Sequence, residues 1–363
     1  MAGLEFSVPY NNDLDTLKGL FQLQGLNGNR IREVYLSGPQ RYSASGRIVE
    51  EMDEAKFVSI VELIHAEGIR VDLIMNPTCE GLDWYREEDI KDKIGFLTRM
   101  HKDYGVEAVT IANPLFVERI REALSDIEIG ASVLGDIDSA QRAVVYEKMG
   151  ANVVTPDVDC NRNLEQLKKL KLATGMEFKL MVNDGCLYKC PFRRFHFNYI
   201  SHKSKELGSV EDDGFFAHCA QIIDHDHSQM LKSGWIRPED LEKYGEVSRF
   251  FKIVGRTRPK SMVLRATRAY MSQEWDGDLT DILSSSINRY SLEVGARLDN
   301  KSLGRINFFE KVTSCDHFCL DCDYCSKLAK DLITRQTPTR GKLEDLGLTQ
   351  LIGEFERRGQ LFQ

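Results

Sequence analysis

Four cysteines stand close together near the carboxyl end of the chain, at Cys315, Cys319, Cys322 and Cys325. Clustered thiolates at such spacings are typical ligands of iron–sulfur clusters, and four thiolates also suit structural zinc. The array lacks the longer spacer that separates the paired cysteines of common zinc sites. We therefore expect a metal centre in this tail, a 4Fe–4S cluster with zinc as the alternative.

The first three of these cysteines also match the spacing of radical S-adenosylmethionine enzymes. In those enzymes the cysteines follow the first strand of the barrel, whereas here they stand close to the end of the chain. Asp321 occupies the position where that motif usually has an aromatic residue. This interpretation is therefore the weakest of the three for the tail.

A second group of cysteines lies in the middle of the chain. Cys186 and Cys190 are close neighbours, and Cys219 follows in a later segment. Three thiolates need one more ligand to complete a 4Fe–4S cluster, and Cys79 is the expected fourth because it follows another strand of the barrel described below. The alternative for any single cysteine is a buried apolar thiol, and we expect this role for Cys160.

The composition places these thiols in a reducing compartment. The chain has 363 residues, 9 cysteines and a formal net charge of −8. No apolar run approaches the roughly 18 residues of a membrane helix, and the first residues do not resemble a secretory signal. We therefore expect a cytoplasmic protein that binds neither membranes nor nucleic acid non-specifically, and whose clustered thiols hold metal rather than disulfides.

Histidines accompany the second cysteine group. His196 and His202 follow Cys190 closely, so they are candidate catalytic residues, either as donors to a substrate or as hydrogen-bond partners of the cluster ligands. Packing without a catalytic role is the alternative for both. His225 and His227 lie in a short polar run, for which an exposed loop is expected.

A basic group follows the last predicted strand. Lys252, Arg256 and Arg258 stand within seven residues. A guanidinium group matches a carboxylate or phosphate through two hydrogen bonds, so Arg256 is a candidate catalytic residue that binds a small anionic substrate. A solvated basic surface is the alternative.

The segments between these groups predict an α/β fold, a (β/α)8 TIM-like barrel. Short apolar runs alternate with helix-period segments, as in βαβ units, and a doubly wound sheet is the alternative. In barrel enzymes the chemistry lies at the carboxyl ends of the strands. Strands are expected at 4–9, 33–37, 70–75, 108–112, 128–133, 152–155, 177–182 and 249–254. Helices are expected at 51–66, 88–104, 116–124, 139–149, 163–172, 265–272 and 279–288.

Two regions do not follow the alternation of strands and helices that predicts the barrel. The segment 183–248, after strand seven, is far longer than an ordinary connection and is expected to be a functional insertion. The barrel with this insertion is expected over 1–260. A helical extension is expected over 261–363, and it contains the cysteine-rich tail at 308–330.

Three motifs resemble peptidase family U32. They are NDGCLYKCPFR at 183–193, WIRPEDL at 235–241 and FKIVGR at 251–256. The resemblance covers residues 1 to about 275, and the family includes UbiU/UbiV-type oxygen-independent hydroxylation proteins and proteins that hydroxylate RNA. It implies a TIM-like barrel with a cysteine-ligated 4Fe–4S cluster. The cysteine-rich tail marks a divergent branch.

The resemblance implies an iron–sulfur redox enzyme, an oxygen-independent hydroxylase or a related modifying enzyme. Its expected substrate is a small anionic compound, or an RNA or cofactor precursor, and the two cysteine groups imply one cluster or two. One alternative is a non-catalytic electron-transfer or scaffold subunit that works with a protein partner in a heteromer. A peptidase is the other, although the sequence has no Gly-x-Ser-x-Gly or His-Glu-x-x-His motif.

Overall fold

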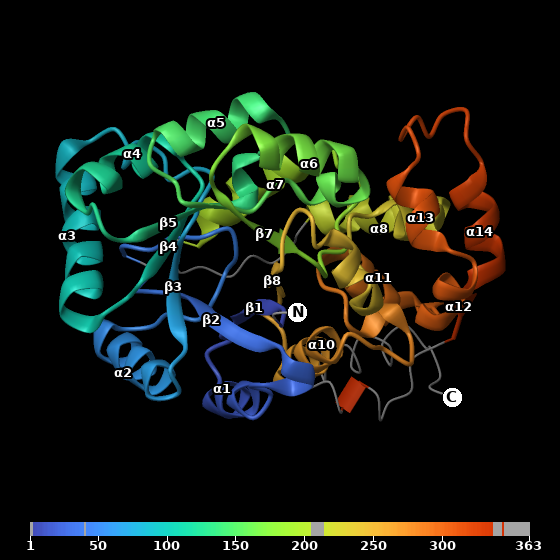
Figure 1. Cartoon of the computed structure of the whole chain (residues 1–363), viewed down its shortest axis with the longest axis horizontal. Coiled ribbons are helices and arrows are strands. Elements are labelled where there is room, and N and C mark those ends of the chain that lie inside the picture. Colours follow the sequence, from blue (N-terminus) through green and yellow to red (C-terminus); the bar gives the residue numbers. More distant parts are fainter. Residues whose placement is uncertain (1–2, 40, 205–213, 337–342, 345–363) are drawn as a thin grey trace.

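Eight parallel strands form a closed barrel in the order β1 to β8 (Figure 1). The computed structural model describes residues 3–39, 41–204, 214–336 and 343–344. The barrel closes where β1 pairs with β8, with Phe6 opposite Phe251 and Ser7 opposite Lys252. The strands are β1 (Glu5–Pro9), β2 (Arg30–Ser37), β3 (Arg70–Met75), β4 (Ala108–Ile111), β5 (Glu128–Ala131), β6 (Val153–Val154), β7 (Glu177–Met181) and β8 (Phe250–Lys252).

The strands form because their residues are buried on both faces. A strand covered by helices outside and by other side chains inside carries a nearly continuous apolar run. In β3, for example, five of the six residues are buried. The predicted barrel is therefore confirmed, and the expected strands match the observed ones to within a few residues.

A ring of helices covers the outside of the barrel. Local capping fixes where several of them begin: the side chain of Asp53 accepts from the backbone N–H of Lys56, and Asn113 caps a helix that starts at Pro114. The helices of the ring are α1 (Leu14–Phe21), α2 (Glu54–Ala66), α3 (Glu87–Tyr104), α4 (Pro114–Ala123), α5 (Ala140–Lys148), α6 (Leu164–Ala173) and α10 (Lys260–Ser272).

The insertion and the tail pack together beside the barrel, where Figure 1 shows the yellow, orange and red segments side by side. Helix α8 of the insertion packs on α11 of the tail, and α9 of the insertion packs on α14 of the tail. The insertion has α7 (Arg193–Lys203), α8 (Gly214–His225), α9 (Ser228–Lys232) and the 3-10 helix η4 (Pro238–Tyr244). The tail has the 3-10 helix η5 (Leu279–Asp281), α11 (Ser285–Val294), β9 (Ala296–Leu298), α12 (Asn300–Arg305), α13 (Phe308–Thr313), α14 (Tyr324–Leu332) and β10 (Ile333–Arg335).

Two expectations differ from the structure. The helix expected at 279–288 is two elements, η5 and α11, because the chain turns at Ser285, the first residue of α11, whose φ is 62°. The boundary expected at residue 260 would separate α10 from the barrel, yet this helix packs on α1 and β1 and belongs to the ring. The extension beside the barrel therefore begins after α10.

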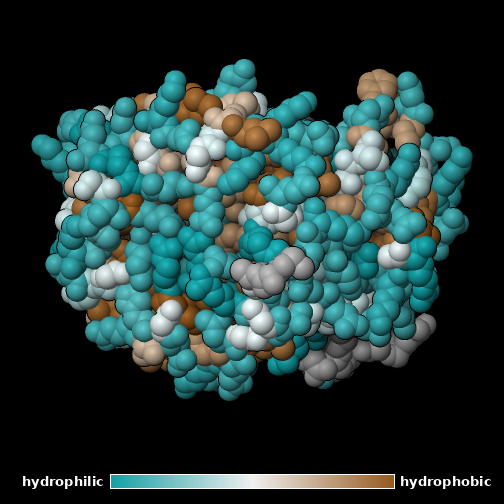
Figure 2. Space-filling model, viewed as in Figure 1, coloured by the Kyte–Doolittle hydropathy of each residue, from teal (hydrophilic) through white to brown (hydrophobic). Residues whose placement is uncertain are grey.

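The surface in Figure 2 is mostly hydrophilic, with small hydrophobic areas scattered over the face shown. Such scattering is ordinary for a folded protein in water. None of the helices in the described ranges is both long enough and apolar enough to cross a membrane.

Candidate functional site

A pocket opens at the mouth of the barrel, where the strands end. The cavity has a volume of about 90 Å³. Its wall is built from residues that follow different strands, among them Asn76 after β3, Ser132 after β5, Asp184 after β7 and Arg256 after β8. The closed barrel brings these residues together, as in other barrels with sites at this end.

Helix α7 of the insertion lies across this mouth. Arg193, the first residue of α7, donates to the carboxylates of Asp157 at 2.8 Å and Asp159 at 3.2 Å. Both aspartates follow β6. Near the last turn of α7, the hydroxyl of Ser201 accepts from the backbone N–H of Thr78, which follows β3, at 2.9 Å. Between these ends, Phe197 lines the pocket. The helix therefore covers one side of the pocket and limits its contact with water.

Guanidinium groups give the pocket a positive wall. Arg256 is buried, and it donates to the hydroxyl groups of Ser37 at 2.6 Å and Ser45 at 3.0 Å. Burial lowers the pKa of Arg256 to about 10. Arg47 lies over the ring of Phe197, with 4.9 Å to the centroid. Within the described residues neither arginine forms an ion pair with a carboxylate, so their charges are available to an anion in the pocket.

Arg258 continues this basic group. It donates to the backbone carbonyl of Ser285 at 3.3 Å, and burial lowers its pKa to about 10. Its charge also interacts with that of Arg47. Of the two arginines after β8, Arg256 is buried and Arg258 is half-buried, so neither is fully solvated.

Below the pocket, a charged network fills the barrel. Lys179 donates to Glu33 at 2.5 Å and to Asp72 at 3.2 Å, and all three side chains are buried. Thr110 donates to both oxygens of Asp72. Burial alone would raise the pKa of Asp72, but the nearby ammonium groups hold it below its ordinary value. Lys252 lies above this network, with its Nζ atom 3.8 Å from Asp72.

Three of the predicted ligands gather beside the pocket. The thiols of Cys190 and Cys219 are hydrogen-bonded to each other, which lowers the pKa of Cys190 to about 6 and raises that of Cys219. Cys186 interacts electrostatically with both. Burial raises the pKa of Cys186 to about 12, and the charges of Arg193 and Arg47 at the pocket act on it in the opposite direction.

Cys79 is not brought to this group. Its Sγ atom lies 3.1 Å from Nε2 of His202, at the carboxyl-terminal end of α7. His196 instead packs among aromatic rings, with its centroid 5.1 Å from that of Phe215 and 5.9 Å from that of Phe197. The two histidines proposed as catalytic therefore have different surroundings, and His202 contacts a predicted ligand.

The segment with the tail cysteines contacts the insertion near Cys186 and Cys190. The ring of Tyr188, which stands between Cys186 and Cys190, stacks on His317 with 5.7 Å between the centroids. His317 itself lies 3.6 Å from the Sγ atom of Cys315. The two cysteine groups are therefore neighbours in space. Cys315 and Cys325 are half-buried, whereas Cys319 and Cys322 are exposed.

Two cations lie near the tail thiols. The charges of Arg162 and Lys232 interact with Cys325, and that of Arg162 also interacts with Cys315. Burial raises the pKa of Cys325 to about 11. Over the ranges that the structure describes, no three His, Cys, Asp or Glu side chains are arranged to hold a metal ion. Cys160 is buried in the hydrophobic core, in line with the structural role expected for it.

Several site residues were not identified from the sequence. Arg47 gave no signal, because its loop has no motif. Lys179 and Asp72 did carry one: each is a charged residue inside an apolar strand, EFKLM in β7 and RVDLIM in β3. A charge in such a strand needs a partner inside the barrel, because burying it alone is costly.

The chain is similar to known proteins over most of its length. The model of peptidase family U32 matches residues 20–276. The "uncharacterized protease" MJ1657 of Methanocaldococcus jannaschii is 27% identical over 333 residues, which cover 90% of this chain and 98% of that protein. The solved structure of the U32 peptidase Mk0906 is 19% identical, covers 59% of this chain and 83% of that one, and has a TM-score of 0.49.

Proposed function

Because the chain belongs to peptidase family U32, we propose that it is an iron–sulfur enzyme that acts on a small anionic substrate in the barrel pocket. The observation that carries the proposal is the meeting of Cys186, Cys190 and Cys219 beside a pocket with buried arginines. Thiolates are the usual ligands of an iron–sulfur cluster. Because no three side chains in the described ranges are arranged to hold a metal ion, these cysteines would have to close around the cluster.

The donor chemistry fits a 4Fe–4S cluster held by these three cysteines and one further ligand. Such a cluster supplies one-electron chemistry or orients a substrate. The remaining work falls to the chain itself. Arg47 and Arg256 bind the anionic group of the substrate, and Phe197 on α7 shields it from water.

The proposed reaction class is an oxygen-independent hydroxylation or a related modification, which rests on the resemblance to the family. The same resemblance leaves an RNA or a cofactor precursor as the alternative substrate. The tail cysteines would hold a second centre, a 4Fe–4S cluster or zinc. The stacking of Tyr188 on His317 supports a path for electrons between two iron–sulfur centres, because it brings the segments that carry the two cysteine groups together.

Purification without oxygen tests the cluster. We expect a brown protein with iron and acid-labile sulfide in equal amounts, and reduced contents of both in Cys186→Ala and Cys190→Ala. Cys160→Ala is the matched control, since this thiol is buried in the hydrophobic core and is not one of the predicted ligands. A colourless protein that contains only zinc would rule out the iron–sulfur proposal.

A cysteine peptidase is the second candidate, because Cys79 and His202 are in contact at 3.1 Å. A histidine beside a cysteine is the arrangement that activates a thiol for attack on a peptide carbonyl. Hydrolysis of casein by the parent and by Cys190→Ala, together with its loss in Cys79→Ala, would support this candidate over the iron–sulfur enzyme. We expect no hydrolysis by any of the three.

A further inference from the structure

We propose that Lys252 is a nucleophilic amine, and that its Nζ atom forms an imine with the carbonyl carbon of an anionic ligand in the barrel pocket. The proposal rests on the pocket of the proposed function, but it does not require the iron–sulfur cluster. It names a reactive group and a class of ligand: a small aldehyde or ketone that carries a carboxylate or a phosphate.

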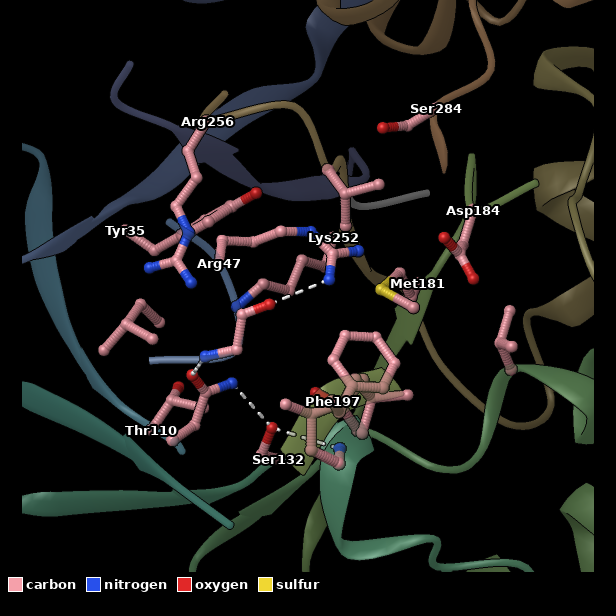
Figure 3. Close-up of a pocket in the computed structure, with 18 of the residues that line it drawn as sticks. Tyr35, Arg47, Thr110, Ser132, Met181, Asp184, Phe197, Lys252, Arg256 and Ser284 are labelled. Atoms are coloured by element: carbon pink, nitrogen blue, oxygen red, sulfur yellow. Dashed lines mark hydrogen bonds between the residues drawn. The ribbon is translucent and has the colours of Figure 1, made fainter. Parts of the chain in front are cut away.

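The first observation is the position of Lys252. It is the last residue of β8, paired with Ser7 of β1 and Met181 of β7, and it lines the pocket. Its side chain is 10% exposed. Figure 3 shows it among the labelled side chains that line the pocket. A ligand in the pocket can therefore reach the amine, whereas bulk water has little access to it.

The second observation is that the Nζ atom has no hydrogen-bond acceptor within the described residues. Asp72 is 3.8 Å away, beyond hydrogen-bond distance. The carboxylate of Asp72 already accepts from Thr110 and from Lys179. The ring of Tyr35 lies below the ammonium group, with 4.0 Å to the centroid. The amine is therefore held in place without being bound by an acceptor.

Lys179 provides a comparison within the same barrel. It is bound by Glu33 and Asp72, and these two carboxylates raise its pKa against the effect of burial. Burial lowers the pKa of Lys252 to about 8, and the charge of Lys179 contributes to this shift. A neutral amine is the nucleophile in imine formation. Lys179 is therefore a structural counterion, whereas Lys252 can lose its proton near neutral pH.

The arginines define the ligand class. Arg256 and Arg47 line the same pocket as Lys252, so an anionic group bound to them leaves the rest of a small ligand in the pocket with the amine. The neutral amine adds to the carbonyl carbon, and one of its protons passes to the carbonyl oxygen, which gives a carbinolamine. The hydroxyl group of the carbinolamine then takes a second proton from solvent and leaves as water. The product is a protonated imine, and Asp72 lies close enough to stabilise its positive charge.

Reductive trapping tests this inference on the full chain. The probes are glyoxylate, an aldehyde with a carboxylate, and pyridoxal phosphate, an aldehyde with a phosphate. Each is incubated with the protein, reduced with borohydride, and located by mass spectrometry of peptides. We expect Lys252 to be labelled at a lower probe concentration than Lys327, whose side chain is 73% exposed. We expect labelling at this site to be absent in Lys252→Arg.

A second experiment tests whether the arginines bind the anionic group of the probe. Arg256→Ala should reduce the labelling of Lys252 by at least about tenfold, because a charge-assisted hydrogen bond to the probe is lost. Benzaldehyde, which has no anionic group, should show no such difference between parent and variant. Equal labelling of Lys252 and Lys327 by both anionic probes, or none at Lys252, would overturn the proposal.

A third measurement distinguishes the imine proposal from the iron–sulfur proposal. The same labelling is measured in Cys186→Ala, whose iron content is determined in parallel. A protein that contains iron and sulfide but is not labelled at Lys252 would retain the proposed function and exclude the imine. Labelled protein without iron would support the imine and exclude the cluster.

Discussion

The Nε2 atom of His202 lies 3.1 Å from the Sγ atom of Cys79 at one end of α7, whereas Cys190 precedes the other end of that helix. A helix of 11 residues is about 16 Å long. Cys79 therefore lies across the barrel mouth from Cys190, too far away to share a cluster with it in this arrangement.

We predict that Cys79→Ala keeps the iron and sulfide content of the parent, whereas Cys190→Ala loses most of both. The physical reason is the length of α7, which separates the two thiols. Iron and sulfide per chain, measured after anaerobic purification, check this. Equal losses in the two variants would mean that α7 moves when the cluster binds, and would restore Cys79 as the fourth ligand.

Arg256→Lys should bind a small anion more weakly than the parent, without a large loss of stability. Lysine keeps the positive charge but loses the planar group that donates to Ser37 and Ser45 and faces the pocket. We expect a loss of affinity of about tenfold, measured by calorimetry with glyoxylate at matched iron content. Unchanged affinity in Arg256→Lys would show that only the charge matters, and unchanged affinity in Arg256→Ala would move the anion elsewhere.

Lys252→Met should stabilise the protein at pH 7, and the gain should shrink at higher pH. Burial lowers the pKa of Lys252 to about 8 in the folded state, against about 10.4 in an unfolded chain. Between these values the unfolded chain holds more protons, so the stability of the parent rises with pH. Urea unfolding of both proteins at pH 7 and pH 10 measures the difference. A gain that does not change with pH would contradict the lowered pKa.

Lys179→Met should destabilise the barrel strongly, by about 3–5 kcal/mol, because it leaves Glu33 and Asp72 buried without their shared cation. Lys169→Met is the control, since Lys169 is exposed on α6. Urea unfolding at pH 7 compares the free energies of unfolding of the two variants with that of the parent. Similar small effects in both would show that the network contributes little.

Arg335→Ala should loosen β10 without unfolding the barrel. Arg335 donates to Asp224 at 2.6 Å and lies 3.1 Å from Nε2 of His227, so it joins the tail strand to the insertion. Both Arg335 and Asp224 are more than half exposed, and such pairs contribute little to overall stability. Faster amide hydrogen exchange at 333–335, with an unchanged melting temperature, is the expected result. Unchanged exchange would show that the β9–β10 pairing alone holds the strand.

The sequence by itself determined the barrel and the rim on which its chemistry lies. Apolar strands such as RVDLIM and EFKLM alternate with amphipathic helices, and only a closed or doubly wound sheet buries so many strands on both faces. It also located Arg256 after the last strand and the cysteines of the insertion. These features follow from local periodicity and from position relative to a strand end.

The tertiary structure decided which of these residues meet. The course of α7 across the mouth places Cys79 with His202 and away from Cys190, which no spacing in the sequence reveals. Within the described residues Lys252 has no hydrogen-bond acceptor, because Asp72 already accepts from Lys179 and Thr110. Contacts of this kind join residues that are distant in the chain, and they are set by the packing of whole elements and by competition for buried charge rather than by local pattern.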